Sequence, residues 1–388
     1  MRHCRHTTSS RFGATARNER GIALLIVLIV VALLTITVTE FTYSVQIDQH
    51  RTRNAIHALQ AQLLARSGIN LAEGFLMLDD EPSYDARSEQ WWLQLAEFCQ
   101  GMQLDESMRV RCRVRDESGK LNINNTRGQV RKTQGQAISG DVILRDAMRC
   151  IFQNKGISLE IVDRLTDYWQ QEQPQRPDGS IVDNQFSSLE DFGAMFGIAT
   201  EDLNKLRPLL TAQKRDILRG ININTAPPEV LAAVLTDNAP QDCGPNAAVE
   251  EIVTRQCDPD HPFKSTGEIR SVLKDVENIS AKASVFDVRS KLYRLEASGV
   301  TNVDPSDPSG AGIGQTLSTL VARHQGISTA RPGSQPAVGP NGKPLPNWTL
   351  RPVDWQKEGG ARLFRENGDQ DLCNPNGENE EEPTPESR

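Results

Sequence analysis

The sequence has none of the short motifs that mark common hydrolases and metal sites. It contains no HExxH and no GxSxG, the patterns of zinc proteases and serine hydrolases. Its seven cysteines include no CxxC pair, which argues against a zinc or redox site. Beyond the first 20 residues, histidines stand only at 50, 57, 261 and 324, and their spacing forms no catalytic pattern. The chain is therefore not expected to be an enzyme, and a membrane-anchored hydrolase is the weakest interpretation.

Basic residues are also fewer than acidic residues. Lys and Arg total 43 against 51 Asp and Glu, a net charge of −8 at pH 7. The first 21 residues carry five arginines and one glutamate, a net +4, so the remainder of the chain is near −12. Because phosphate contacts need clustered Lys and Arg, nucleic acid is not an expected partner.

One segment lacks charge altogether. Residues 21–39 hold no charged side chain, and this length is enough for a helix to cross a bilayer core of ~30 Å. The arginines before it predict that this end stays in the cytoplasm and that the C-terminal bulk crosses the membrane. A secretory signal would have a shorter apolar core and small residues before its cleavage site, whereas this run ends in TVTEFT. A plain anchor and a helix cut on its cytoplasmic side remain as interpretations.

Proline is absent from residues 40–78, so the helix is expected to continue past the membrane and to end at the DDEP segment. Large apolar side chains recur there at helical spacing. They predict a face that packs against the folded part of the chain, formed by Ile56, Leu59, Leu63, Leu71, Phe75 and Leu78.

The remaining chain indicates a small sheet interrupted by a helical insertion. Residues 108–115, MRVRCRVR, alternate apolar and basic side chains as a strand with one exposed face does. Two further candidate strands, 285–297 and 315–323, come some 160 residues later by this reading. The interval has helical periodicity, with candidate helices at 141–153, 159–171, 189–196, 201–210, 229–235, 249–257 and 268–273.

The helical interval contains two pairs of similar segments. KLNINN at 120–125 recurs as GININT at 220–225, and FSSLEDF at 186–192 recurs loosely as FKSTGEI at 263–269. In the second pair, Ser188 with Asp191 and Ser265 with Glu268 have the spacing of a helix capping box. These similarities predict two related helical units inside one insertion.

The N-terminus resembles the class III, or prepilin-type, signal. A basic leader ends in Arg20 and Gly21 directly before the apolar run. This resemblance implies that a prepilin peptidase cuts after Gly21 and that Ile22 becomes a methylated N-terminus. Most pilins carry glutamate at the fifth mature position, where this chain has Ile26. Since that glutamate is thought to pair with a neighbouring subunit in the lipid, its absence suits a subunit with nothing stacked above it.

A series of motifs over residues 20–325 resembles one family, the type II secretion system protein K, a minor pseudopilin. It comprises the cut-site glycine, AQLLARSGINLAEGFL, RVRDESGKLNIN, SSLEDF, LRPLLTAQKR and GININTAPPEVLAAVL. The resemblance implies an α+β, pilin-like fold: a long transmembrane helix packed on a small antiparallel sheet, with a large all-helical insertion. It also implies an inner-membrane protein, single-pass, with its bulk in the periplasm.

The resemblance, which covers residues 20–325, and the composition of the tail together divide the chain into five parts. Residues 1–21 are the leader, and 22–78 form the long helix, whose first ~18 residues span the membrane. Residues 79–120 and 284–325 make the pilin-like domain, and 121–283 the insertion. Residues 326–388, rich in Pro, Gly, Asn and Glu, are expected to be disordered.

The family's role is to sit at the tip of the pseudopilus with the minor pseudopilins I and J. There it is thought to start assembly and to contact secreted substrate or the outer-membrane channel. The implied partners are therefore I and J, other pseudopilins, the prepilin peptidase and the inner membrane.

Six cysteines remain after removal of the leader, and an even number in an oxidising compartment predicts disulfides. The expected pairs are Cys243 with Cys257, which closes a short Pro- and Gly-rich loop, and then Cys99 with Cys112.

No cofactor is required by this reading, but members of the family often bind calcium in the insertion. The matching segment here, 165–192, keeps Asp167, Asp178, Asp183 and Glu172 as oxygen donors, the ligand type that calcium prefers. The alternative is that these are solvated loop acids.

The segment NINTAPPEVL resembles the start of a helix-hairpin-helix, a module often found on DNA. A membrane-anchored DNA-binding or DNA-uptake protein is thus the alternative function. Residues 221–235 contain no Lys or Arg to hold phosphate, which favours a packing unit.

Overall fold

This computed structural model describes residues 19–99, 102–105, 107–127, 139–171, 184–236, 243–274, 276–301, 312–325 and 348–358. The chain divides into two units, residues 1–57 and 58–388. Helix α1 (Glu19–Leu76) begins three residues before the expected start and ends two residues before the expected end. The leader before residue 19 lies outside the described residues.

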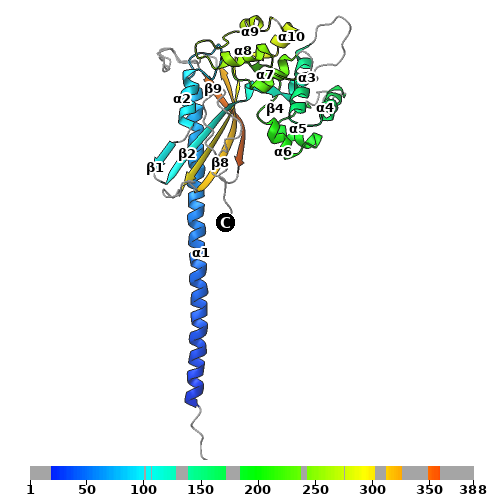
Figure 1. The fold of residues 1–388 in the computed structure, drawn as a ribbon. Helices are drawn as coiled ribbons and strands as arrows, with labels where there is room; N and C mark the ends of the chain where they lie inside the picture. The colour runs from blue at the N-terminus through cyan, green and yellow to red at the C-terminus, as the bar shows by residue number, and fades with distance from the viewer. Residues whose placement is uncertain are drawn as a thin grey trace, which may run out of the picture. The chain divides into compact units, whose positions relative to one another are not determined.

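The second unit contains a five-stranded antiparallel sheet of order β1-β2-β7-β8-β9 (Figure 1). Its strands are β1 (Met102–Asp105), β2 (Met108–Asp116), β7 (Leu292–Thr301), β8 (Ile313–Gln325) and β9 (Trp348–Glu358). The alternating segment 108–115 is β2, as expected, and its neighbour β7 follows it in the sheet although the insertion separates the two in sequence.

Strand β9 corrects the expectation that residues 326–388 are disordered throughout. Residues 348–358 pair with β8 along its length, from Trp348 opposite Gln325 to Glu358 opposite Thr316. Sequence alone did not indicate this strand because Pro352 interrupts its pattern and proline is unfavourable inside a sheet. At the outer position that β9 occupies, proline is tolerated, and the register shifts nearby, at Leu320 and Val321.

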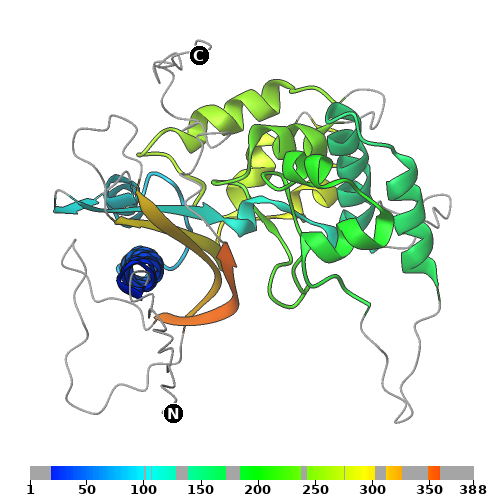
Figure 2. The same ribbon diagram turned by 90° about the horizontal axis from the view of Figure 1, so that it is seen from below.

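The last five turns of α1 pack on one face of the sheet, and Figure 2 shows the helix end-on against it. Small residues make this contact. Gly68 lies so close to β2 that an added Cβ would stand 2.9 Å from Val110 Cγ1, and one on Gly299 of β7 would stand 2.2 Å from the Ala61 carbonyl oxygen. The backbones therefore approach as only glycine and alanine allow.

Helix α2 (Gln90–Cys99) covers the same face, where Trp91 and Leu95 join the core that α1 and the sheet share. The sequence did not predict this helix.

The insertion between β2 and β7 consists of two consecutive units. The first runs through η1 (Glu117–Gly119), β3 (Leu121–Asn122), η2 (Ile123–Thr126), α3 (Gly140–Asn154), α4 (Glu160–Gln170), α5 (Leu189–Phe196), α6 (Thr200–Leu206) and β4 (Leu210–Thr211). The second runs through β5 (Ile221–Asn222), α7 (Pro228–Leu235), α8 (Ala247–Gln256), α9 (Thr266–Val272), α10 (Ile279–Ala283) and β6 (Phe286–Asp287). The seven expected helices are all present within a few residues. The insertion is not all-helical, since β3 pairs with β4 and β5 with β6, both in parallel.

The similar segments make equivalent hydrogen bonds in each of the two units of the insertion. Asn124 donates through Nδ2 to the Phe186 carbonyl at 2.9 Å, and its Oδ1 accepts from the Phe186 N–H at 2.9 Å. Asn224 makes the same pair of hydrogen bonds with Phe263, again at 2.9 Å each. These contacts show that NINN and NINT are corresponding structural positions in two related units.

Candidate assembly site

The first half of α1 presents a continuous apolar surface. All of the side chains from Gly21 to Tyr43 are exposed within their unit, and α1 is the one helix in the described part of the chain that is long and apolar enough to cross a membrane. The hydroxyls of Thr35, Thr37, Thr39 and Thr42 donate to backbone carbonyls three or four residues earlier, at 2.7–2.9 Å. Their polar groups are thereby satisfied inside the helix, as a hydrocarbon environment requires.

The two residues expected for processing, Gly21 and Ile22, and the position expected to define the tip, Ile26, lie at the start of this surface. Gly21, Ile22 and Ile26 are helical, and the two isoleucines expose 59% and 55% of their surface. Because the Gly21–Ile22 peptide bond lies in the first turn of α1, a peptidase that needs an extended chain must first unwind this turn.

The second half of α1 corrects the predicted packing face. The buried positions are small or medium in size and follow helical spacing: Ala61, Ala65, Ile69, Ala72 and Leu76. Three of the large residues expected on this face are exposed instead: Leu59 and Leu63 at 57% each and Leu71 at 49%. Phe75 and Leu78 agree with the prediction, since both are half-buried and pack against the core that α1 shares with the sheet. We call Leu59 and Leu63, which both lie in the second unit, the outer stripe of α1.

A buried ion cluster connects the end of α1 to the sheet. Arg323 of β8 is 1% exposed at its side chain and donates to Asp79 Oδ2 at 2.8 Å and to Asp85 Oδ1. Its guanidinium lies over the Trp348 ring at 4.4 Å from the centroid, and Trp348 Nε1 donates to the Asp79 carbonyl at 2.7 Å. Burial lowers the pKa of Arg323 to about 10, against the opposing effect of Asp79, so the side chain stays charged at neutral pH.

A second buried network joins the sheet to the insertion. Asp116, the last residue of β2, accepts from the hydroxyls of Thr225 and Ser290 and from the Ser118 N–H at 2.7 Å. Gly119 packs against the same threonine, since an added Cβ would stand 2.8 Å from the Thr225 carbonyl oxygen. We call these five residues the joint.

An ion pair next to the joint is also buried. Glu117 accepts from Lys120 Nζ at 2.7 Å and from Arg294 Nε at 3.1 Å. Burial alone would raise the pKa of Glu117, but Lys120 and Arg294 hold it at about 2. The connection between β2 and the insertion is therefore held by paired charges as well as by hydrogen bonds.

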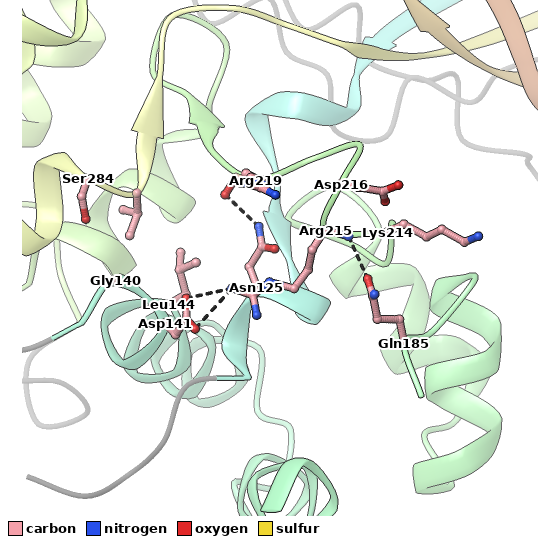
Figure 3. Close-up of a pocket in the computed structure, with 11 residues that line it drawn as sticks. Asn125, Gly140, Asp141, Leu144, Gln185, Lys214, Arg215, Asp216, Arg219 and Ser284 are labelled. Atoms are coloured by element: carbon pink, nitrogen blue, oxygen red, sulfur yellow. Dashed lines mark hydrogen bonds and ion pairs between the residues drawn. The ribbon is translucent and has the colours of Figure 1, made fainter. Parts of the chain in front are cut away.

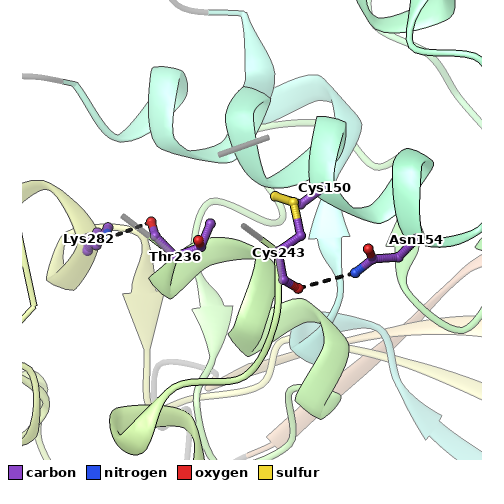
Figure 4. Close-up of a disulfide and its surroundings, with 5 residues drawn as sticks. All are labelled: Cys150, Asn154, Thr236, Cys243 and Lys282. Atoms are coloured by element: carbon purple, nitrogen blue, oxygen red, sulfur yellow. Dashed lines mark hydrogen bonds between the residues drawn. A yellow bond between two sulfur atoms is a disulfide. The ribbon is translucent and has the colours of Figure 1, made fainter. Parts of the chain in front are cut away.

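The disulfides agree with one expected pair and correct the other. Cys99 is bonded to Cys112, which ties α2 to β2. Cys243 is bonded to Cys150 of α3 and not to Cys257, and Asn154 donates to the Cys243 carbonyl at 3.2 Å (Figure 4). The short loop between Cys243 and Cys257 contains helix α8, while the fold brings α3 beside Cys243 from 93 residues away. Cys257 is itself disulfide-bonded.

The calcium expectation stays a prediction. Asp167 is exposed on α4 and lines a small cavity of about 280 Å³ together with Arg164 and Tyr168. Asp178, Asp183 and Glu172 lie outside the described residues. Within the described ranges, no group of three His, Cys, Asp or Glu side chains has a metal-binding arrangement.

The helix-hairpin-helix resemblance corresponds to a packing unit. Every residue of α7 from Val230 to Leu235 is buried, so this helix has no face left for a DNA backbone. The histidines considered for a hydrolase are dispersed among elements: His50 and His57 lie on α1, His261 in the loop after α8 beside Asp258, and His324 on β8.

Two known proteins are similar to the chain. The type II secretion system protein K of Pseudomonas aeruginosa (strain PAO1) is 29% identical over 243 residues, which covers 56% of this chain and 68% of that protein. A chain in the crystal structure of the GspK–GspI–GspJ complex from the type 2 secretion system of enterotoxigenic Escherichia coli matches with a TM-score of 0.52 and 15% identity. That match covers 79% of this chain and 99% of the other, and at this identity it shows the fold. No protein-family model matches the chain.

Proposed function

We propose that the chain is a minor pseudopilin of the type II secretion protein K kind and that it occupies the tip of the pseudopilus, on the similarity in sequence and in fold described above. In this proposal α1 anchors it in the inner membrane, its bulk lies in the periplasm, and it helps to start pseudopilus assembly for the export of folded proteins. The proposal rests on helix α1, whose first half is apolar and exposed and whose second half packs on a pilin-like sheet.

The outer stripe of α1 supports the assignment of partners. Leu59 and Leu63 lie beyond the membrane-spanning part and are each 57% exposed. Apolar side chains at this spacing form a surface that another helix covers. The solved complex in which the similar chain is found contains GspI and GspJ, and we propose that the corresponding minor pseudopilins cover this stripe.

The tip position is supported by Ile26. A carboxylate at this depth is costly in hydrocarbon unless it is paired, and a subunit with nothing above it has no neighbouring amine to pair with. For the last subunit of a fibre, an apolar side chain at this position therefore costs less free energy than an unpaired carboxylate would.

Processing is tested by the intact mass and the N-terminal peptide of the protein extracted from membranes. We expect a chain that begins at methylated Ile22 in cells with an active prepilin peptidase, and a chain that retains residues 1–21 in cells without it. A full-length chain in both strains would reject the processing step and with it the assembly into a pseudopilus.

The tip position is tested by Ile26→Glu, with Ile29→Glu as a control for the general cost of a carboxylate in the span. If the residue defines the tip, the first variant should appear along the fibre by immunogold labelling, whereas the control should only lower the amount of membrane-inserted protein. Labelling of Ile26→Glu at fibre ends alone would contradict this role.

A further inference from the structure

The functions described above leave two features of the insertion unused. One is an open cavity of about 780 Å³ around Asn125, where its two units meet (Figure 3). The other is Cys257, which caps the C-terminal end of α8 and is disulfide-bonded. The bond of Cys257 carries an inference about the part of the chain that follows β9.

The number of cysteines restricts the partner of Cys257 to two residues. Four of the seven cysteines form the two disulfides described above, and the others besides Cys257 are Cys4 and Cys373. Both lie outside the described residues. Cys4 precedes the uncharged run 21–39, whereas Cys257 and Cys373 follow it.

The membrane separates Cys4 from Cys257. In the proposed function the run 21–39 crosses the inner membrane, so these two thiols lie on opposite sides of a hydrocarbon core of ~30 Å. Cys4 also belongs to the leader that is expected to be removed. Cys373 is therefore the partner that remains, and in this step the inference rests on the proposed function.

The register of the sheet gives the distance from the end of β9 to the joint. Strand β9 ends at Glu358, ~20 Å from Pro352 at ~3.3 Å per residue. Pro352 lies in the same cross-strand row as Asp116, three strand spacings or ~14 Å away. Because this row runs across the strands, Glu358 lies about 25 Å from Asp116.

From the joint, two side-chain contacts lead to Cys257. One is the hydrogen bond between the threonine and the aspartate of the joint. In the other, Gln256 Nε2 donates at 3.1 Å to the carbonyl of Ala226, which follows that threonine. These contacts add at most about 25 Å. The 15 residue steps from Glu358 to Cys373 cover up to ~50 Å, so Cys373 can reach Cys257.

The end of α8 is a firm point of attachment. The Cys257 N–H donates to the Val253 carbonyl at 3.3 Å. Arg255 pairs with Glu268 and lies over the Phe263 ring at 3.9 Å from the centroid. Cys257 itself is half-buried, so one side of it faces solvent. A bond at this residue therefore connects to the packed second unit of the insertion.

We propose that Cys257 and Cys373 form a disulfide and that residues 359–372 are a strap between β9 and α8. Strand β9 is an outer strand, and within the described part of the sheet its neighbour is β8. With the bond, the chain is held on both sides of β9, so a detached strand explores fewer conformations before it pairs again. The sheet and the insertion are then joined covalently as well as through the joint.

Formation of the bond oxidises two thiols. The thiolate of one cysteine attacks the disulfide of a periplasmic protein oxidant and forms a mixed disulfide with it. The thiolate of the other cysteine then displaces the oxidant. The two electrons and two protons pass to the oxidant, which leaves as a dithiol. A bond of this kind persists in the oxidising periplasm.

A peptide map of the full chain tests the bond. The protein is extracted from membranes, alkylated without reduction and digested with trypsin, which places Cys257 on peptide 256–264 and Cys373 on peptide 366–388. We expect the two peptides as one linked species that separates on reduction. In Cys373→Ser, peptide 256–264 should instead carry an alkylated thiol.

The same map shows what fails if the proposal is wrong. Alkylated Cys373 in a chain that begins at Ile22 would overturn the strap and leave the proposed function intact. A link between Cys257 and Cys4 would overturn both, because it requires the two residues on one side of the membrane.

Hydrogen exchange tests whether the bond holds β9. In Cys257→Ser and in Cys373→Ser, the amides of residues 348–358 should exchange about fivefold faster, because β9 is detached in a larger share of molecules. The double variant should match either single variant, since all three lack the same bond. Asn374→Ser, which keeps the bond, is the control and should stay within about twofold of wild type. Unchanged exchange in the cysteine variants, or additive effects in the double variant, would overturn the strap.

Discussion

At the residue scale, Arg323 shows how one buried charge organises the region around it. Its guanidinium pairs with Asp79 after α1 and with Asp85 before α2, and it lies against the Trp348 ring of β9. These residues come from three separate parts of the chain, and removal of Arg323 would leave the carboxylates of Asp79 and Asp85 buried without their cation. Breaking a buried ion pair is costly because the remaining charge has no compensation.

We therefore expect Arg323→Met to destabilise the protein by about 3–5 kcal/mol. The reason is that Asp79 and Asp85 would be left buried without their cation. Urea unfolding of the detergent-solubilised chain measures the loss, and Arg351→Met, an exposed arginine on β9, is the control. Adding Asp79→Asn and Asp85→Asn to Arg323→Met should restore part of the stability, and strictly additive losses would contradict the cluster.

Glu89 gives a pH dependence at the same scale. Burial, followed by the charge of Asp79, raises the pKa of Glu89 to about 9, and its Oε2 accepts from the Ala86 N–H at 2.7 Å. In the unfolded chain this carboxyl loses its proton near its ordinary pKa of about 4.5. Between pH 4.5 and about 9, the carboxyl of Glu89 is protonated in the folded state and ionised in the unfolded state. The contribution of Glu89 to the free energy of unfolding is therefore fully present below pH 4.5 and is lost as the pH rises towards 9.

Glu89→Gln should consequently stabilise the protein more at pH 8 than at pH 5, by on the order of 1–2 kcal/mol. Paired unfolding curves at the two pH values measure the difference. Glu97→Gln, at an exposed position of α2, is the control for loss of a carboxylate. If wild type and Glu89→Gln differ in unfolding free energy by the same amount at both pH values, the carboxyl of Glu89 is ionised in the folded protein.

At the element scale, the long-range disulfide holds the two units of the insertion together. Cys150 lies on α3 of the first unit and Cys243 just before α8 of the second. Lys282 Nζ reinforces this region by donating to the carbonyls of Leu235 and Thr236, at 3.0 and 2.8 Å, at the end of α7 (Figure 4). A bond that closes a longer loop removes more entropy from the unfolded chain.

Replacing Cys150 and Cys243 with alanine should therefore lower stability by about 3–5 kcal/mol, more than the corresponding change at Cys99 and Cys112. The two pairs span 93 and 13 residues. Thermal unfolding under non-oxidising conditions compares the variants, and a non-reducing peptide map checks the pairing. A peptide that links Cys243 to Cys257 would refute the assignment.

At the scale of the whole folded part, residues 58–388, the joint determines whether the sheet and the insertion move as one rigid body. Asp116 ends β2, and Ser118 and Gly119 follow it in η1. Thr225 approaches them from the insertion and Ser290 from the segment between β6 and β7. Because these contacts are buried and satisfied, forces applied to the insertion are transmitted to the sheet through them.

Gly119→Ala is expected to loosen the joint. Its methyl group would stand 2.8 Å from the Thr225 carbonyl oxygen, so the backbone must shift. We expect a loss of about 1–3 kcal/mol and faster hydrogen exchange at residues 116–122. Gly74→Ala is the control, because no atom lies within 4 Å of the added carbon and alanine favours a helix by about 0.5–1 kcal/mol. Unchanged exchange in Gly119→Ala would show that the joint is not tightly packed.

The sequence by itself determined the features that depend on local pattern. The uncharged run, the alternating strand β2, the helices of the insertion and the recurring asparagines are set by side chains a few residues apart, so periodicity reveals them. The resemblance to the type II secretion system protein K and the expected pilin-like plan rest on the same ordered motifs.

Only the tertiary structure decided which residues meet across long separations. The buried face of α1 combines alanine and glycine with Ile69 and Leu76, because the backbones approach closely at Ala61 and Gly68. Side-chain size alone pointed to Leu59, Leu63 and Leu71, which are exposed. Strand β9, the Cys150–Cys243 bond, the Arg323 cluster and the cavity at Asn125 each join segments whose distance in sequence carries no periodic signal. Their free energy comes from burial and pairing between elements, and these contacts exist only once the chain has folded.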